Sequence, residues 1–326
     1  MSLPVARFAV LDAPHCVWAP DLRDRNIQFL RSIDPRYYAY VVRANEDRLD
    51  DPTDRHYAAA ALRLAFYQGV ENLFAMLGAA VQAPHCVYGW LLKYSIRDLR
   101  EVTRRIDSGD PLLTLLPGDP LSWESISTVV HCLDGAPPEF CGAVQRGFAQ
   151  AWTRLAEEFL TREHQEEYNS LKHGARARLG GFSLTMRSET HFGATGTSRP
   201  GIHIPGSEFG SRFPILVGIG QDRRNSTVGT CARNWGPRFL LDALCLIADS
   251  LNNIISYLLV QNGLPGSECK LRYPDNLTVF EDMWTPEYQV IGQRMTPRFD
   301  ATNARVLTRD EILAVYATPA NQQRPQ

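Results

Sequence analysis

The sequence predicts a mostly α-helical protein of the α+β class: a bundle of four to five helices that carries a small antiparallel β insertion. Long stretches place apolar residues three and four positions apart, which is the helical period. Between about residues 181 and 232 this pattern gives way to β-rich segments separated by glycine, proline and serine. Hydrophobic residues make up 44% and charged residues 21% of the 326 positions, as in ordinary globular proteins.

The length is sufficient for one or two domains, and three regions differ in pattern. Residues 1–56 contain several prolines and are expected to form an N-terminal arm with a strand or two and a short helix near 24–32. Residues 57–264 are expected to form the bundle. Residues 265–326 are expected to form a C-terminal extension that ends in a disordered tail.

The bundle helices are predicted from apolar periodicity and from proline and glycine boundaries. Their expected ranges are 57–82, 87–106, 122–133, 138–174 and 237–262, and the fourth helix ends at Gly174 or, if it continues, at Gly180-Gly181. On the first of them Arg63, Tyr67 and Glu71 follow at spacings of four and form one polar line. This line favours a solvated, salt-bridged helix face over the wall of a cleft.

The remaining elements are short. Residues 182–186 alternate in polarity and residues 213–219 are β-rich, so both are expected to be strands of the insertion. A further strand is expected at 277–280. A final helix is expected to begin at Thr308, whose hydroxyl and the Glu311 carboxylate have the spacing of a capping box.

Composition excludes several function classes. The formal net charge of −2 provides no overall attraction to nucleic acid or to an acidic membrane, so such contacts need a local patch. The seven cysteines include no Cys-x-x-Cys pair, and no secretory leader is evident, which predicts reduced thiols in a cytoplasmic protein. The apolar segment 239–260 carries Asp242 and Asp249, so it is interpreted as a buried helix rather than a membrane span.

The dipeptide His-Cys occurs three times, and the pentapeptide Ala-Pro-His-Cys-Val occurs at both 13–17 and 83–87. Zinc accepts thiolate and imidazole together, but none of the pairs has the usual finger spacing. No metal and no cofactor are therefore expected.

The stretch from Glu166 to Gly174 is the candidate site. Asn169 and His173 are four residues apart, so a helix places them on one face, with Lys172 beside them. An imidazole near its natural pKa, an amide that orients it and a fixed cation can together move a proton and stabilise a phosphate. The alternative is structural, because cations and a following glycine also favour a helix C-terminus.

Basic residues continue beyond this stretch, at Arg176 and Arg178, and no carboxylate occurs between Lys172 and Ser188. Part of this order complements the helix dipole. It also makes a local basic patch that suits phosphate.

The segment Tyr168-Asn169-Ser170-Leu171-Lys172-His173 resembles the signature of the HEPN superfamily, in which arginine, a polar residue, three further residues and histidine lie near the end of a core helix. The polar residue and the histidine match, whereas Tyr168 occupies the arginine position. The resemblance implies an HEPN-like helical bundle with a metal-independent ribonuclease site, often shared across a homodimer. In that site the histidine acts on the ribose 2′-hydroxyl, and here Lys172 or Arg176 has to supply the missing charge.

Three functions follow from these observations. The leading hypothesis is an HEPN-like protein that acts on RNA, a metal-independent endoribonuclease of toxin or defence type, with His173 as base, Asn169 orienting it and Lys172 at the phosphate. Tyr168 belongs to the same candidate site, and Arg63, Glu71, Arg176 and Arg178 are the expected binding residues. The alternative is a non-catalytic nucleotide- or protein-binding bundle. The third is a structural dimer in which the cluster of Tyr168, Asn169 and His173 is a satisfied core network.

Overall fold

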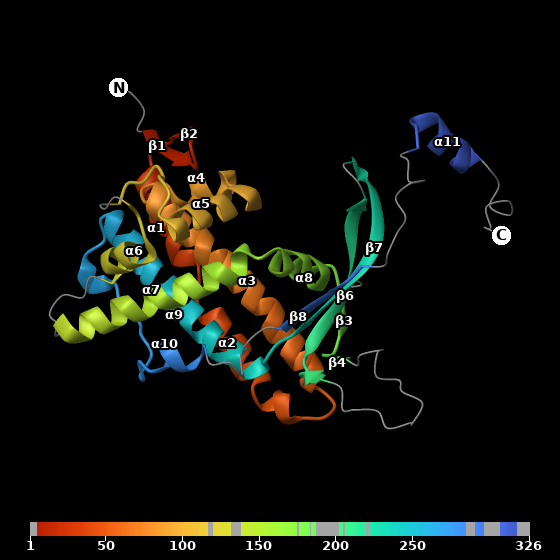
Figure 1. Ribbon diagram of the computed structural model, residues 1–326. Coiled ribbons are helices and arrows are strands. Elements are labelled where there is room, and N and C mark those ends of the chain that lie inside the picture. The colour runs from red at the N-terminus through yellow and green to blue at the C-terminus, as the bar shows by residue number, and fades with distance from the viewer. Residues whose placement is uncertain are drawn as a thin grey trace, which may run out of the picture.

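The computed structural model describes residues 5–116, 120–131, 138–174, 176–182, 184–186, 202–204, 206–219, 222–284, 291–296 and 307–317. Figure 1 shows a helical body with a long β-hairpin beside it. The described part of the chain is mostly helical with small antiparallel sheets, which confirms the predicted α+β class at that level.

Two long helices form the centre of the body. Helix α3 (Arg55–Gln82) packs along α9 (Pro237–Gln261), and most residues of both are buried. Helix α9 begins with proline at its first position, where no hydrogen-bonding amide is lost. Inside α3, Gly78 lets the buried Trp90 ring lie directly against the helix, since a Cβ there would be only 2.5 Å from the ring.

Two predicted helices are each broken into two, so the continuous ranges 87–106 and 138–174 were wrong. The first is α4 (Val87–Lys93) followed by α5 (Ile96–Ser108), because Ser95 caps α5 in a reciprocal capping box with Asp98. The second is α7 (Pro138–Leu160) followed by α8 (Arg162–Lys172). Between them Thr161 is extended, and its hydroxyl accepts the His164 amide, which starts a new helix.

The N-terminal region folds onto this body. Its elements are the hairpin β1 (Val5–Val10) and β2 (Ala13–Trp18), the helices α1 (Leu22–Ser32) and α2 (Arg36–Asn45), and the short 3-10 helix η1 (Asp47–Asp50). Helix α2, which was not predicted, packs against both α3 and α9. Helix α6 (Trp123–Val130) begins at the expected cap, Ser122, and packs against α7.

A four-stranded antiparallel sheet has the order β3-β6-β7-β8. Its strands are β3 (Arg178–Leu179), β6 (Gly210–Ile219), β7 (Asp222–Asn234) and β8 (Ile291–Met295), and a separate pair consists of β4 (Leu184–Met186) and β5 (Ile202–Ile204). Because β8 follows α9, the C-terminal extension completes a sheet that the predicted insertion only begins. Figure 1 shows the β6–β7 hairpin reaching past the end of α8, which contacts β6.

The C-terminal region differs from the prediction at one element. The strand expected at 277–280 is wrong, because Val279–Asp282 forms the short helix α10, with Phe280 buried against α7. A 3-10 helix, η3 (Gly266–Glu268), precedes it, and α11 (Arg309–Ala317) closes the described chain. The capping box of Thr308 with Glu311 is confirmed. The tail expected to be disordered lies outside the described residues.

Among the described residues, α3 and α9 are long and apolar enough to cross a bilayer by length and composition. Their most apolar windows are 78% and 67% buried inside the protein. Buried core helices are often equally long and apolar, so length and composition do not distinguish these two helices from membrane spans.

Candidate functional site

Helix α8 presents the predicted catalytic residues at its C-terminal end. Asn169 and His173 are both exposed and lie one turn apart, with the His173 amide donating to the Asn169 carbonyl at 3.3 Å. Gly174 follows in the left-handed conformation, φ 62°, and ends the helix. Within the described chain no side-chain hydrogen bond joins Asn169 to the His173 ring, so no contact supports the expected role of the amide in orienting the imidazole.

Lys172 and Tyr168 lie together on this helix. The Lys172 Nζ atom is 5.5 Å from the centre of the Tyr168 ring, and that ring stacks on Tyr67 of α3 at 5.4 Å. Burial raises the pKa of the nearby half-buried Glu71, and the charge of Lys172 partly opposes the shift. The structure therefore brings together Tyr168, Lys172 and Glu71, three of the predicted site residues.

The next cations follow on the sheet edge. Arg176 and Arg178 are exposed, and Arg178 of β3 is the register partner of the exposed Arg212 of β6. Arg212 donates to the Gly181 carbonyl at 3.2 Å. We call the exposed set Lys172, His173, Arg176, Arg178 and Arg212 the cationic face. No carboxylate of the described residues forms a salt bridge with any of its members.

Arg63 does not belong to this surface, and the prediction that it binds a ligand there was wrong. Its side chain is fully buried, as is that of Tyr67, so the polar line on α3 is not a solvated face. The Arg63 Nη2 atom donates to Tyr67 Oη at 2.6 Å and to Glu167 Oε2 at 3.1 Å. Its charge is already neutralised inside the protein.

Glu167 is the centre of a buried ion network. Its Oε1 accepts hydrogen bonds from Ser211 Oγ at 2.7 Å and from Trp235 Nε1 at 2.9 Å. Its Oε2 accepts from Tyr67 Oη and Arg63, and lies 3.2 Å from Arg233 Nη1. The carboxylate thus ties α8 to α3, to β6 and to the end of β7.

A second carboxylate completes the network. Glu158 of α7 lies 3.3 Å from Arg63 and 3.2 Å from Arg233, so two guanidinium groups face two carboxylates. Burial alone would raise the pKa of Glu167, but Arg63 and Arg233 outweigh it and hold that pKa below the ordinary value. Burial alone would lower the pKa of Arg63, but Glu167, Tyr67 and Glu158 raise it. Despite burial, the pKa of Glu158 is likewise held below its ordinary value and that of Arg233 above it, so all four groups are charged at neutral pH.

Two uncharged groups adjoin these ions. Burial raises the pKa of Tyr67 well above its ordinary value. Burial also lowers the pKa of His164, and its ring packs edge-on against Tyr67 at 4.4 Å. Its Nδ1 atom lies 3.7 Å from Glu158, and neither ring nitrogen has a hydrogen-bond partner among the described residues.

The network supports the cationic face without being part of it. Glu167 and Tyr168 are neighbours on α8, so anchoring the first fixes the orientation of the second and of the exposed turn beyond it. The sequence prediction missed Glu158, Glu167, Ser211, Arg233 and Trp235 as a connected set. The acid-free run near Arg233 was visible in the sequence, but its pairing with α7 and α8 depends on the fold.

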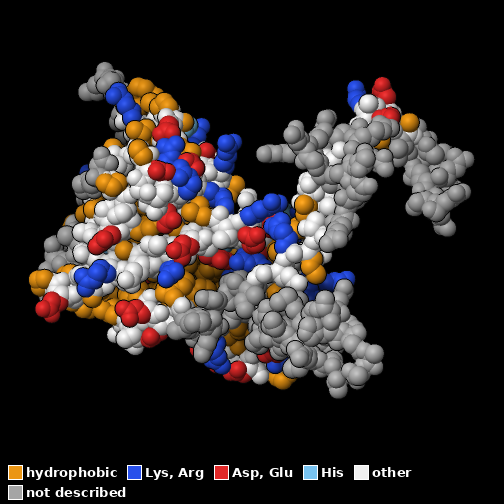
Figure 2. Space-filling model, viewed as in Figure 1, with side chains coloured by type: hydrophobic (Ala, Val, Ile, Leu, Met, Phe, Trp, Pro, Cys, Tyr) orange, Lys and Arg blue, Asp and Glu red, His pale blue; other side chains and the backbone are white. Residues whose placement is uncertain are grey.

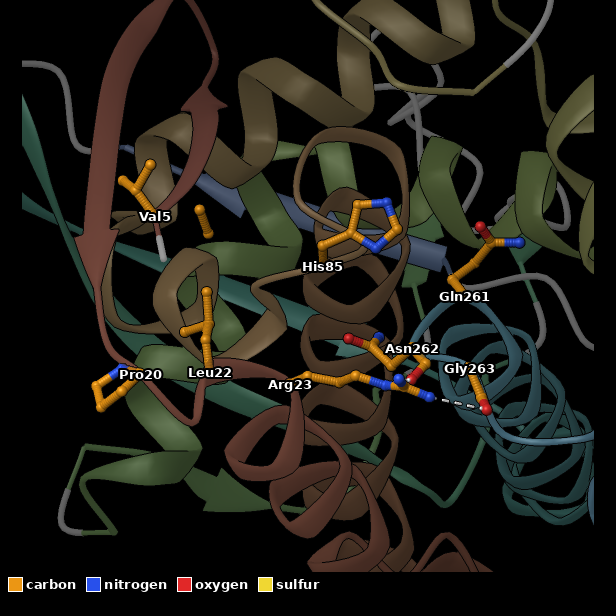
Figure 3. Close-up of a pocket in the computed structure, with 9 residues that line it drawn as sticks. Val5, Pro20, Leu22, Arg23, His85, Gln261, Asn262 and Gly263 are labelled. Atoms are coloured by element: carbon orange, nitrogen blue, oxygen red, sulfur yellow. Dashed lines mark hydrogen bonds between the residues drawn. The ribbon is translucent and has the colours of Figure 1, made fainter. Parts of the chain in front are cut away.

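The structure contains several surface hollows, and none of the three described here is lined by His173. One hollow, of about 510 Å³, lies beside the end of α9, and Figure 3 shows the residues that line it. There Arg23 donates to the carbonyl oxygens of Asn262 and Gly263 at 2.5 and 3.0 Å, so it satisfies the helix end. A hollow of about 260 Å³ lies next to Arg233 and Arg294, but Arg294 is paired with Glu163 and Glu166.

Within the described part of the chain, no group of three or more His, Cys, Asp or Glu side chains is arranged to hold a metal ion. His15 lies on β2 and stacks on Phe8, whereas His131 is buried and stacks on Phe148. These two members of the repeated His-Cys pairs therefore serve packing.

Comparisons of the chain with protein-family models, with curated proteins and with solved structures found no match.

Proposed function

We propose that the protein is HEPN-like, binds RNA through the cationic face, and uses His173 to cleave the bound strand without a metal. The observation that carries the proposal is the exposure of His173 among Lys172, Arg176, Arg178 and Arg212, with no described carboxylate paired to these cations. Phosphate is the ligand that such a surface suits. The overall net charge of −2 makes the local excess the relevant quantity.

The chemistry needs only groups on this surface and the substrate. The neutral imidazole of His173 accepts the ribose 2′-hydroxyl proton, the 2′-oxygen attacks the adjacent phosphorus, and the bond to the 5′-oxygen breaks. The products are a 2′,3′-cyclic phosphate and a 5′-hydroxyl that takes its proton from water. Lys172 stabilises the charge on the phosphate oxygens.

Tyr168 stands where the family has arginine, and a neighbouring lysine can replace the missing charge. The Tyr168 ring stacks on Tyr67 and also contacts the Lys172 ammonium, so a cation is held close to the position where the family places arginine. Lys172 therefore supplies the positive charge on this turn of α8. A shared dimer site would bring the same turn from a second copy.

Cleavage is tested with single-stranded RNA in the presence of chelator. His173→Gln should lower kcat at least about 100-fold, the usual contribution of a general base. His85→Gln, an exposed histidine outside the cationic face, is the matched control and should cleave normally. Absence of cleavage by the unaltered protein, or equal cleavage by His173→Gln, removes the nuclease claim.

Binding is tested separately through its salt dependence. Four phosphate contacts on a single strand give a slope of about −3 in log affinity against log salt, or about 50-fold weaker binding at 200 mM than at 50 mM. The double variant Lys172→Gln/Arg176→Gln should reduce the size of that slope by about half. An unchanged slope would place RNA elsewhere.

A second candidate is RNA or nucleotide binding without turnover. Two observations favour it: none of the hollows described above encloses His173, and the Asn169 amide does not bond to its ring. Binding that persists in His173→Gln, together with no strand cleavage by the unaltered protein, would select this function.

A further inference from the structure

A groove of about 940 Å³ lies between α5 and the junction of α7 with α8. Its apolar lining includes Leu11, Ile96 and Leu160, and its polar lining includes Arg97, Arg100 and Gln165. Ligand pockets typically measure about 300 to 1,000 Å³ and combine an apolar wall with a few polar groups. Figure 2 shows lysine and arginine side chains gathered over both α5 and α8 on this side of the molecule.

Most charged groups in the groove are already engaged. Arg100 donates to the carbonyl oxygens at the end of α7, at 2.6 Å for Leu160, so it is held in place. Asp98 accepts from the Ser95 amide and hydroxyl, and Glu101 pairs with Arg104 and Arg105. These carboxylates therefore have partners of their own.

Arg97 is different. It is exposed on the first turn of α5, and no described side chain forms a hydrogen bond or a salt bridge with it. The end of α5 does not replace it as an anion site, because the Asp98 amide is taken by Ser95 Oγ. An anion that enters the groove therefore meets Arg97.

The groove also contains a strained residue. Leu11 has φ 56° and is the one non-glycine residue with positive φ in the described chain. The amide of the buried Gln82 holds it there, accepting from the Leu11 amide at 3.0 Å and donating to the Leu11 carbonyl at 2.9 Å. Leu11 is the first residue of the two-residue turn that joins β1 to β2, where hairpins favour positive φ, so the turn and Gln82 together fix its position at the groove.

Helix α8 connects the groove to the cationic face. Gln165, Asn169 and His173 follow at spacings of four and occupy one side of the helix, with all three exposed. His173 lies eight positions after Gln165, which corresponds to about 12 Å along the helix axis. A short extended oligonucleotide spans this separation.

We propose that the groove binds one nucleotide of a single-stranded RNA, two helical turns from the phosphate at His173. The base packs on Leu11 and Ile96, and Arg97 pairs with the phosphate of that nucleotide. The path along α8 rests on the proposed function, but the groove alone is sufficient to bind a mononucleotide. The substrate class is therefore single-stranded RNA whose strand lies along α8.

Adenosine monophosphate and adenosine are the probes, titrated against the full chain by calorimetry. The monophosphate should bind about 10-fold more tightly than adenosine, as expected for a charged hydrogen bond, and Arg97→Gln should abolish the difference. Arg43→Gln is the matched control and should bind normally, because Arg43 is exposed on α2 and forms no hydrogen bond or salt bridge through its side chain among the described residues. If Arg97→Gln and the unaltered protein bind the monophosphate with equal affinity, the proposal that the groove binds a nucleotide is refuted.

Leu11→Asn separates binding from folding. Asparagine tolerates the left-handed backbone, so relief of strain should offset the lost apolar contact and keep the melting temperature within a few degrees. Adenosine affinity should nevertheless fall, because the base loses its apolar contact. Unchanged adenosine affinity in a folded Leu11→Asn protein refutes the assignment.

The same titrations distinguish this inference from the RNA function. Lys172→Gln should weaken a long oligonucleotide and leave the monophosphate unaffected, because Lys172 is not in the groove. Monophosphate binding that depends on Arg97, with no oligonucleotide binding, would keep the groove and remove the RNA function. Oligonucleotide binding that depends on Lys172, with no effect of Arg97→Gln, would do the reverse.

Discussion

Replacing Glu167 with glutamine should strongly destabilise the protein. The carboxylate is fully buried and interacts with Arg63 at 3.1 Å and Arg233 at 3.2 Å, besides its hydrogen bonds from Ser211 and Trp235. The variant leaves two buried guanidinium groups facing Glu158 alone. Removing one partner from a buried pair costs about 3 to 5 kcal/mol, because the remaining charge has lost its compensation.

Urea unfolding followed by circular dichroism measures this cost. With a slope of about 2 to 3 kcal/mol per molar, the midpoint should fall by about 1 to 2 M. Glu166→Gln is the matched control, because Glu166 and its partners Arg162 and Arg294 all remain partly exposed to solvent. Such pairs contribute about 0 to 1 kcal/mol, so the control midpoint should move little.

Comparing the two neighbouring glutamates tests whether the buried network holds α8 in place. If Glu167→Gln costs no more than Glu166→Gln, the buried network does not hold α8 in place. A double variant, Arg63→Met with Glu167→Leu, provides a second check. It should lose less stability than the two single changes added together, since neither charge is then left unpaired.

Three further predictions follow from packing and titration. Gly78→Ala should cost about 1 to 3 kcal/mol in urea unfolding, because its Cβ would lie 2.5 Å from the buried Trp90 ring. Burial lowers the pKa of His131 to about 4, whereas in the unfolded chain the imidazole has its ordinary pKa of about 6.5. The free energy of unfolding should therefore be unaffected by this group above about pH 6.5 and should fall by about 3 kcal/mol towards pH 4, because the unfolded chain binds the proton first. His131→Leu should flatten that pH profile. Arg178→Glu should weaken RNA binding without shifting the melting temperature, since Arg178 is exposed, and a shift in the melting temperature alone would contradict its place on the cationic face.

Several elements could be predicted because their signals are local. The apolar periodicity of 57–82 and 237–262 corresponds to α3 and α9, and the caps at Ser122 and Thr308 depend on residues within three positions. The breaks at Ser95 and Thr161 are also made by local caps. They were overlooked because the helical period continues on both sides of each cap.

The candidate site divides in the same way. The one-turn spacing of Asn169 and His173 follows from helix geometry, and both side chains are exposed, as a site on the surface requires. The placement of Arg63 could not be predicted, because its pairing with Glu167 brings together residues 104 positions apart. Polar periodicity on α3 does not distinguish a solvated face from one whose charges are matched by another helix.

The repeated pentapeptide shows where local information ends. Ala-Pro-His-Cys-Val forms strand β2 at 13–17, whereas at 83–87 it forms the loop that enters α4. The first copy is paired with β1, and in the second the Cys86 side chain is buried next to Phe8. The sequence alone therefore determined composition, helical periods, caps and the basic run after Lys172. Only the tertiary structure decided which charges are neutralised inside and which remain on the surface, because burial and pairing depend on residues distant in the chain.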